Sequence, residues 1–152
     1  MKMKNNFLKA ALSVIFLSAA ILGAVAFFIY DKKWVGAVFI ALGFLHLVVL
    51  RFFKVRMRAV WPDVVFGAID NGILVIGAMI GADFAGILGA IVGGAAANAV
   101  TDGFAGVFEG WVAERFKYNK RTALTSAVGK MAGCMFGAGL VFFVAWTLLS
   151  LF

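Results

Sequence analysis

The stretch that decides the fold runs from residue 66 to residue 106 and reads FGAIDNGILVIGAMIGADFAGILGAIVGGAAANAVTDGFAG. It contains no Lys or Arg, and it is long enough for two membrane-spanning helices, since one crossing takes about 20 apolar residues. We therefore expect two consecutive transmembrane helices that meet at Asp83, with a re-entrant hairpin as the alternative because almost no polar loop separates them. The polar side chains inside the stretch are Asp70, Asn71, Asp83, Asn98, Thr101 and Asp102.

The rest of the chain has the same character. Of its 152 residues, 64% are hydrophobic and 14% are charged, whereas soluble domains are about 45–50% apolar and about 25% charged. So large an apolar excess cannot be buried inside a small protein, because much of a small protein is surface. Soluble enzymes, nucleic-acid-binding domains and secreted disulfide scaffolds are thereby excluded, and the sequence predicts an integral protein of the lipid bilayer.

Five stretches are long and apolar enough to cross the membrane as helices. We expect an all-α, polytopic bundle in one membrane domain, 1–152, with two peripheral helices in 1–58 and a glycine-rich three-helix core in 59–152. Small residues that lie four apart let membrane helices approach closely. Gly129, Gly133 and Gly137 have this spacing. Faces of this kind also serve homodimers. The five stretches are 10–30, 34–53, 64–82, 84–112 and 123–152.

The Lys and Arg residues predict the orientation. With five crossings, eleven of them fall on the side of the N-terminus and two on the other side, while Lys130 lies inside the last helix. The positive-inside rule then places the N-terminus in the cytoplasm and the C-terminus outside. The net charge of +7 is thus a topology signal and not a nucleic-acid-binding feature. A short Lys/Asn-rich start without an Arg-rich transit peptide favours a prokaryotic cytoplasmic membrane. The first apolar run resembles a secretory signal but is longer than a typical signal core, so we expect a retained helix.

Ionisable residues inside a membrane are costly and commonly functional. In the 84–112 helix, Asn98 and Asp102 lie one turn apart, and Glu109 returns to the same face two turns later. Asp70 in the 64–82 helix lies roughly 12 Å from the cytoplasmic end, and Asp102 roughly 18 Å, at about 1.5 Å of rise per residue. We expect the two carboxylates to meet near the midplane, with Lys130 at a comparable level.

Carboxylate, amide and hydroxyl oxygens are hard ligands that suit Ca²⁺ or Na⁺. No enzyme signature accompanies them: a single histidine, His46, and a single cysteine, Cys134, leave no catalytic triad, no disulfide and no thiol or imidazole metal site. We expect no enzymatic activity and no bound cofactor. A transported cation is the ligand that the residue types favour.

The segments FGAIDNGILVIGAMIG (66–81) and AAANAVTDGFAG (95–106) together resemble the transmembrane protein 65 family. Members carry an Asp-Asn pair on one helix and an Asn-x-x-Ser/Thr-Asp motif followed by a nearby Gly on the next. The resemblance covers roughly residues 60–140, with Leu74 and Ala97 as departures from the pattern. The animal members are mitochondrial inner-membrane proteins tied to Na⁺/Ca²⁺ exchange, which implies cation exchange in or near this bundle. The matching residues are Asp70, Asn71, Asn98, Thr101, Asp102 and Gly106.

Two functions remain open. In the first, the protein is a cation exchanger, and a homodimer because five short helices hardly enclose a shielded path. Asp70 and Asp102 bind Ca²⁺ or Na⁺, Asn71, Asn98 and Thr101 complete the oxygen shell, and a water-accessible cavity reaches Asp102. In the second, the chain is a non-transporting subunit that scaffolds or regulates a larger membrane complex, and its polar cluster is dry and internally paired.

Two further residues have accessory roles in the first hypothesis. Glu109 gates the cytoplasmic mouth, or it only ends the polar stripe. Lys130 supplies a counter-charge in the site, or it extends toward the interface as long basic side chains do.

Overall fold

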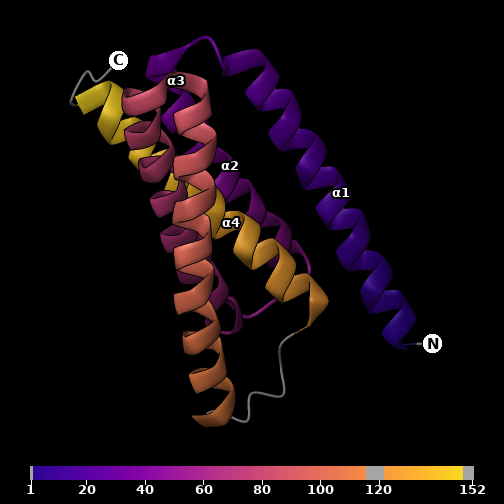
Figure 1. The fold of residues 1–152 in the computed structure, drawn as a ribbon. Helices are drawn as coiled ribbons and strands as arrows, with labels where there is room; N and C mark the ends of the chain where they lie inside the picture. The colour runs from indigo at the N-terminus through magenta and orange to yellow at the C-terminus, as the bar shows by residue number, and fades with distance from the viewer. Residues whose placement is uncertain (1, 116–121, 149–152) are drawn as a thin grey trace.

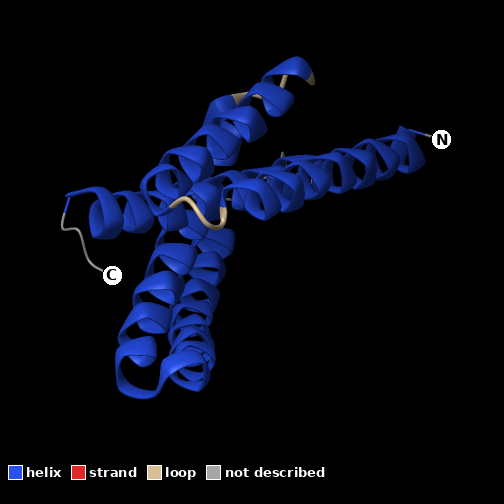
Figure 2. Ribbon diagram, turned by 90° about the horizontal axis from the view of Figure 1, so that it is seen from above, coloured by secondary structure: helices blue, strands red, loops and turns tan. Residues whose placement is uncertain are grey.

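The computed structural model describes the backbone of residues 2–115 and 122–148, and the side chains of residues 7–31, 33–107 and 122–146. Within these ranges the chain is helical, with short turns and no strand (Figures 1 and 2). The helices are α1 (Lys2–Phe28), α2 (Lys32–Phe52), α3 (Met57–Arg115) and α4 (Ala123–Phe142), followed by the short π-helix η1 (Phe143–Leu148). The expected all-α class is confirmed.

Four of the described helices are long and apolar enough to cross a membrane. Their outer surfaces are apolar as well: Phe84 is 86% exposed, Ile87 84% and Phe27 79%. A soluble protein does not leave so many large apolar side chains uncovered, so this is an integral membrane protein.

The helix α3 is a hairpin. Its backbone leaves the helical region at Ala85 (φ −144°, ψ 26°) and Gly86 (φ 57°, ψ −136°). We call residues 57–84 the first arm and residues 87–115 the second arm, and Figure 1 shows the two running side by side. The reversal lies two and three residues beyond Asp83, because Gly86 adopts a positive φ that other residues avoid.

Glycines set the spacing between the two arms. A Cβ atom added at Gly81 would overlap the carbonyl oxygen of Gly89, and one added at Gly93 would overlap that of Gly77. The backbones of the two arms are therefore in direct contact over the half of the hairpin that lies nearest the reversal. Lipid provides no hydrophobic force between helices, so membrane helices depend on such close packing.

The helix α4 packs along the first arm in the same way. A Cβ atom at Gly133 would overlap the carbonyl oxygen of Val64, and one at Gly137 would overlap that of Ala68. A capping box begins α4: the Thr122 side chain accepts from the backbone N–H of Thr125, and the Thr125 side chain accepts from that of Thr122.

The helices α2 and α1 complete the bundle. Gly36 and Gly43 of α2 lie against Phe143 and Phe136. The N-terminal end of α1 extends away from the other helices in Figure 2, while Leu17, further along α1, is fully buried. One hydrophobic cluster joins parts of all four helices, and its buried members are Ala10, Leu17, Leu50, Val60, Val64, Leu124, Val128 and Ala132.

Candidate intramembrane polar site

A hydrogen bond joins the two arms of the hairpin near the middle of their length, farther from the reversal than the glycine contacts. The Thr101 hydroxyl on the second arm donates to Oδ1 of Asp70 on the first arm. Thr101 is buried, 4% exposed, and its oxygen also lies 3.0 Å from the carbonyl oxygen of Asn98 and 3.2 Å from that of Ala97. A threonine in a helix commonly faces such preceding carbonyls. Thr101 thus fixes a carboxylate at the contact between the arms.

A second polar pair lies on the second arm alone. Nδ2 of Asn98 donates to Oδ2 of Asp102 at 2.9 Å. The two residues are one helical turn apart, so their side chains are neighbours. Asn98 is half-buried, but Asp102 is exposed on the surface of the chain.

The expected set of ion ligands is therefore divided into two hydrogen-bonded pairs. Thr101 and Asp102 are consecutive residues of one helix, so they point about 100° apart around its axis. Thr101 faces the first arm and Asp70, while Asp102 pairs with Asn98. The two carboxylates accept hydrogen bonds from different groups, at neighbouring positions along the hairpin.

The remaining ligand of the expected shell, Asn71, lies at another interface. Its Nδ2 atom donates to the carbonyl oxygen of Cys134 at 3.3 Å. This bond ties the first arm to α4, beside the glycine contacts described above.

Of the two accessory residues, Lys130 is described in full. It is half-buried on α4, and its Nζ atom lies 5.0 Å from the centroid of the Phe66 ring, within the range of a cation–π interaction. The backbone of Glu109 is helical, but its side chain lies outside the described residues.

Two fully buried polar residues of the described part of the chain were not among the expected site residues. Asp63 is fully buried, and its Oδ1 atom accepts from the Ser126 hydroxyl at 3.3 Å. The signal for it was its position two turns before Asp70, on the same face of the first arm. His46 is also fully buried, and its Nδ1 atom donates to the carbonyl oxygen of Leu42 at 2.6 Å.

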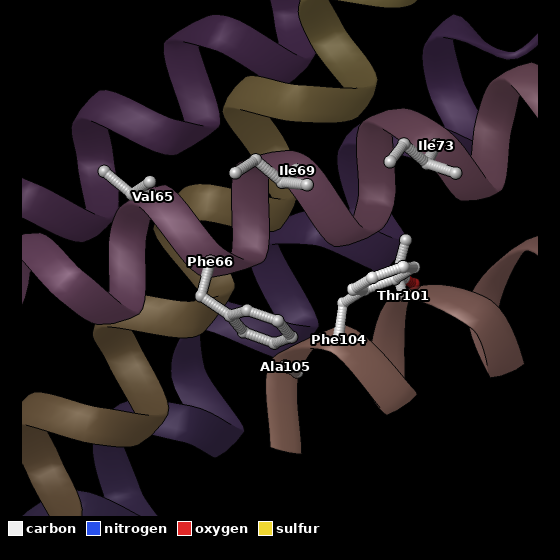
Figure 3. A pocket seen from close by; sticks show the side chains of 7 residues that line it. All are labelled: Val65, Phe66, Ile69, Ile73, Thr101, Phe104 and Ala105. Atoms are coloured by element: carbon white, nitrogen blue, oxygen red, sulfur yellow. The ribbon is translucent and has the colours of Figure 1, made fainter. Parts of the chain in front are cut away.

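An apolar groove of about 440 Å³ lies between the two arms. Figure 3 shows that residues of both arms line it, and Thr101 is the polar residue among them. The residue whose hydroxyl donates to Asp70 is therefore also part of the groove wall. Its lining residues are Val65, Phe66, Ile69, Ile73, Thr101, Phe104 and Ala105.

Within the described part of the chain, no group of three or more His, Cys, Asp or Glu side chains is placed to hold a metal ion. Each polar pair supplies one carboxylate, together with hydroxyl, amide and backbone oxygens. Such oxygens suit a hard cation, but one carboxylate balances only half the charge of Ca²⁺.

Comparisons with known proteins add no relative: no protein-family model, curated protein or solved structure matches this chain.

Proposed function

We propose that the protein is a membrane cation transporter of the Na⁺/Ca²⁺-exchange type with an intramembrane carboxylate and amide site. The observation that supports this most is the Asp70–Thr101 pair, held between two predominantly apolar arms. Interhelical hydrogen bonds in membrane proteins contribute only about 0.6 kcal/mol on average. Packing alone therefore rewards an intramembrane aspartate poorly, whereas cation binding requires one.

The proposed site uses Asp70 and Thr101 between the arms and Asn98 and Asp102 on the second arm, with Asn71 behind them. Alternating access of this site would let Na⁺ or H⁺ displace Ca²⁺ or a similar cation. Lys130 would compete with the cation for the carboxylates, and Glu109 would act at the cytoplasmic mouth.

The proposal includes a topology. The two arms of α3 cross separately, which gives five crossings, with the N-terminus in the cytoplasm of a prokaryotic cell and the C-terminus outside. The resemblance of residues 66–81 and 95–106 to the transmembrane protein 65 family agrees with cation exchange as the activity.

The test is ion flux in proteoliposomes that contain only this protein. Vesicles loaded with Na⁺ receive external Ca²⁺, and an internal indicator reports uptake. We expect uptake that depends on the Na⁺ gradient and is lost in both Asp70→Asn and Asp102→Asn. The matched control is Asp83→Asn, which removes an exposed carboxylate near the reversal of the hairpin and should leave flux unchanged. Equal flux in wild type and both site variants would remove these residues from the mechanism.

A second candidate is a non-transporting membrane subunit. The observation that favours it is the internal pairing of the polar groups: Asp70 with Thr101, and Asp102 with Asn98. The groove beside them is lined mainly by apolar side chains, as a dry cluster would require. No flux with any cation pair, in folded protein, would favour this function over transport.

A further inference from the structure

One exposed face of the second arm, between residues 95 and 106, is unlike the other exposed surfaces of the hairpin. Elsewhere both arms expose large apolar side chains, as lipid contact requires: Ile69, Ile73, Ile76 and Ile80 on the first arm, and Ile87, Phe104 and Val107 on the second. The exposed residues of this one face are small: Ala95, Ala99, Gly103 and Gly106. A Cβ atom added at Gly103 or Gly106 would meet no atom of the chain. We call these four residues, with Asn98 and Asp102, the small-residue face.

This face carries an exposed carboxylate within a membrane-spanning segment. Asp102 lies inside the apolar span that ends at Val107, about 20 Å from Arg115 at the helical rise of 1.5 Å per residue. An aspartate near the centre of a membrane helix is energetically costly when it faces lipid. The small-residue face is therefore better suited to protein than to lipid.

We propose that a second copy of this chain covers the small-residue face, and that the two Asp102 carboxylates, one from each copy, bind one cation between them. The proposal rests on the proposed function for its cation, but its interface can be tested without transport. In a two-fold dimer with its axis along the membrane normal, the same patch meets itself. Small residues then let the two second arms approach closely.

The polar groups on this face fit a copy of themselves. Asn98 has two N–H donors, and one of them donates to Asp102 of its own chain. In the proposed dimer, the other N–H would donate across the two-fold axis. Asp102 supplies acceptor oxygens at the same place. A bound cation would favour the same arrangement: the described part of a single chain offers no group of three or more His, Cys, Asp or Glu side chains for a metal, while two copies would place two carboxylates around one cation.

The pairing has an electrostatic consequence. Two carboxylates at one site repel each other, and at an apolar interface this repulsion is strong unless a cation or a proton lies between them. The dimer should therefore be more stable with Ca²⁺ than without it.

The experiment is disulfide cross-linking in liposomes at low protein density, in full-length chain that carries Cys134→Ala. Ala99→Cys places a thiol on the small-residue face. The control is Ile76→Cys, which places a thiol on the exposed isoleucine row of the first arm. We expect cross-linked dimer with Ala99→Cys and several-fold less with Ile76→Cys. Equal yields, or a higher yield with Ile76→Cys, would overturn the interface.

A further experiment repeats the cross-linking once with Ca²⁺ and once with a chelator. We expect a several-fold higher yield with Ca²⁺, and we expect Asp102→Asn in the Ala99→Cys chain to cross-link equally in both conditions. If the Ala99→Cys chain that retains Asp102 cross-links equally with Ca²⁺ and with the chelator, the shared cation site is overturned. Cation-dependent cross-linking without any flux would instead contradict only the proposed transport.

Discussion

At the scale of single residues, the most informative group is the Thr101 hydroxyl. Among the residues whose side chains the structure describes, it is the one polar group that links the second arm to the Asp70 carboxylate, and Thr101 lines the apolar groove between the arms. It therefore connects the packing of the hairpin to the chemistry of the proposed site.

Replacing Thr101 separates these two roles. Thr101→Val keeps the shape of the side chain and leaves the Asp70 carboxylate without its donor, so we expect a loss of about 0.6–1.7 kcal/mol in stability and loss of flux. Thr101→Ser keeps the hydroxyl and should retain most of both. Unfolding in mixed micelles and the proteoliposome assay measure the two effects. A fully active Thr101→Val chain would show that the hydroxyl serves packing only.

The residue types were readable from the sequence, but their pairing was not. Asp70, Asn98, Thr101 and Asp102 stand out because they are polar residues in apolar spans. Their directions depend on how the arms rotate against each other. Thr101 faces Asp70 because the glycine contacts Gly77–Gly93 and Gly81–Gly89 set that rotation, and a count of residues from the helix ends cannot supply it.

At the scale of helices, glycines decide where α4 and the two arms lie. The sequence predicted this close packing from glycines at spacings of four, and Gly133 and Gly137 indeed contact the backbone of the first arm. The sequence did not separate these glycines from Gly103 and Gly106, which face open space. Both pairs lie within about one helical turn in an apolar span, and only the tertiary structure tells them apart.

We expect Gly137→Ala to destabilise the protein by about 1–3 kcal/mol, as overpacking of a close contact does. The added methyl group would collide with the backbone of Ala68, which has no flexible end to move aside. The matched control is Gly23→Ala in α1, where a Cβ atom meets nothing, and it should be neutral or slightly stabilising. Denaturant unfolding of the two variants compares them directly, and equal midpoints would argue against the α3–α4 contact.

Gly86 gives a backbone prediction at the same scale. Its φ of 57° and ψ of −136° lie in a region that is nearly restricted to glycine, and other residues there cost about 1–3 kcal/mol. Space is not the obstacle, because a Cβ atom at Gly86 would meet no atom of the chain. Gly86→Ala should therefore lower the unfolding midpoint relative to wild type. The control, Gly23→Ala, should not lower it. An unchanged midpoint would mean that the reversal of the hairpin adopts another conformation.

At the scale of the whole molecule, the apolar composition was sufficient to predict a helical membrane protein, since helices satisfy every backbone hydrogen bond internally in lipid. The end of α1, both ends of α2 and the start of α4 lie within two residues of the predicted bounds, whereas α1 begins at Lys2, eight residues before the predicted apolar stretch, and α4 ends at Phe142. The position of the reversal in α3 was less well predicted. The prediction rested on the charge of Asp83, whereas the backbone turns at Ala85 and Gly86.

The orientation of the chain can be tested at its ends. Five crossings place the two termini on opposite sides of the membrane, and a re-entrant α3 hairpin, which leaves three crossings, places them in the same way. We expect a green fluorescent protein fused to the N-terminus to fluoresce, and an alkaline phosphatase fused to the C-terminus to be active in a bacterial host. The reverse fusions are the control and should both be silent. Fluorescence from both termini would contradict the five-crossing topology.

The close contact between the two arms of α3 has a consequence for how the protein is made. A nascent chain that ends at residue 84 has the first arm complete, but it lacks Thr101, the donor for Asp70. Its glycine row is then open to lipid, because the backbone that covers it has not been synthesised. The first arm should thus remain associated with the insertion machinery until the second arm emerges, and the hairpin should enter the bilayer as one unit during biosynthesis.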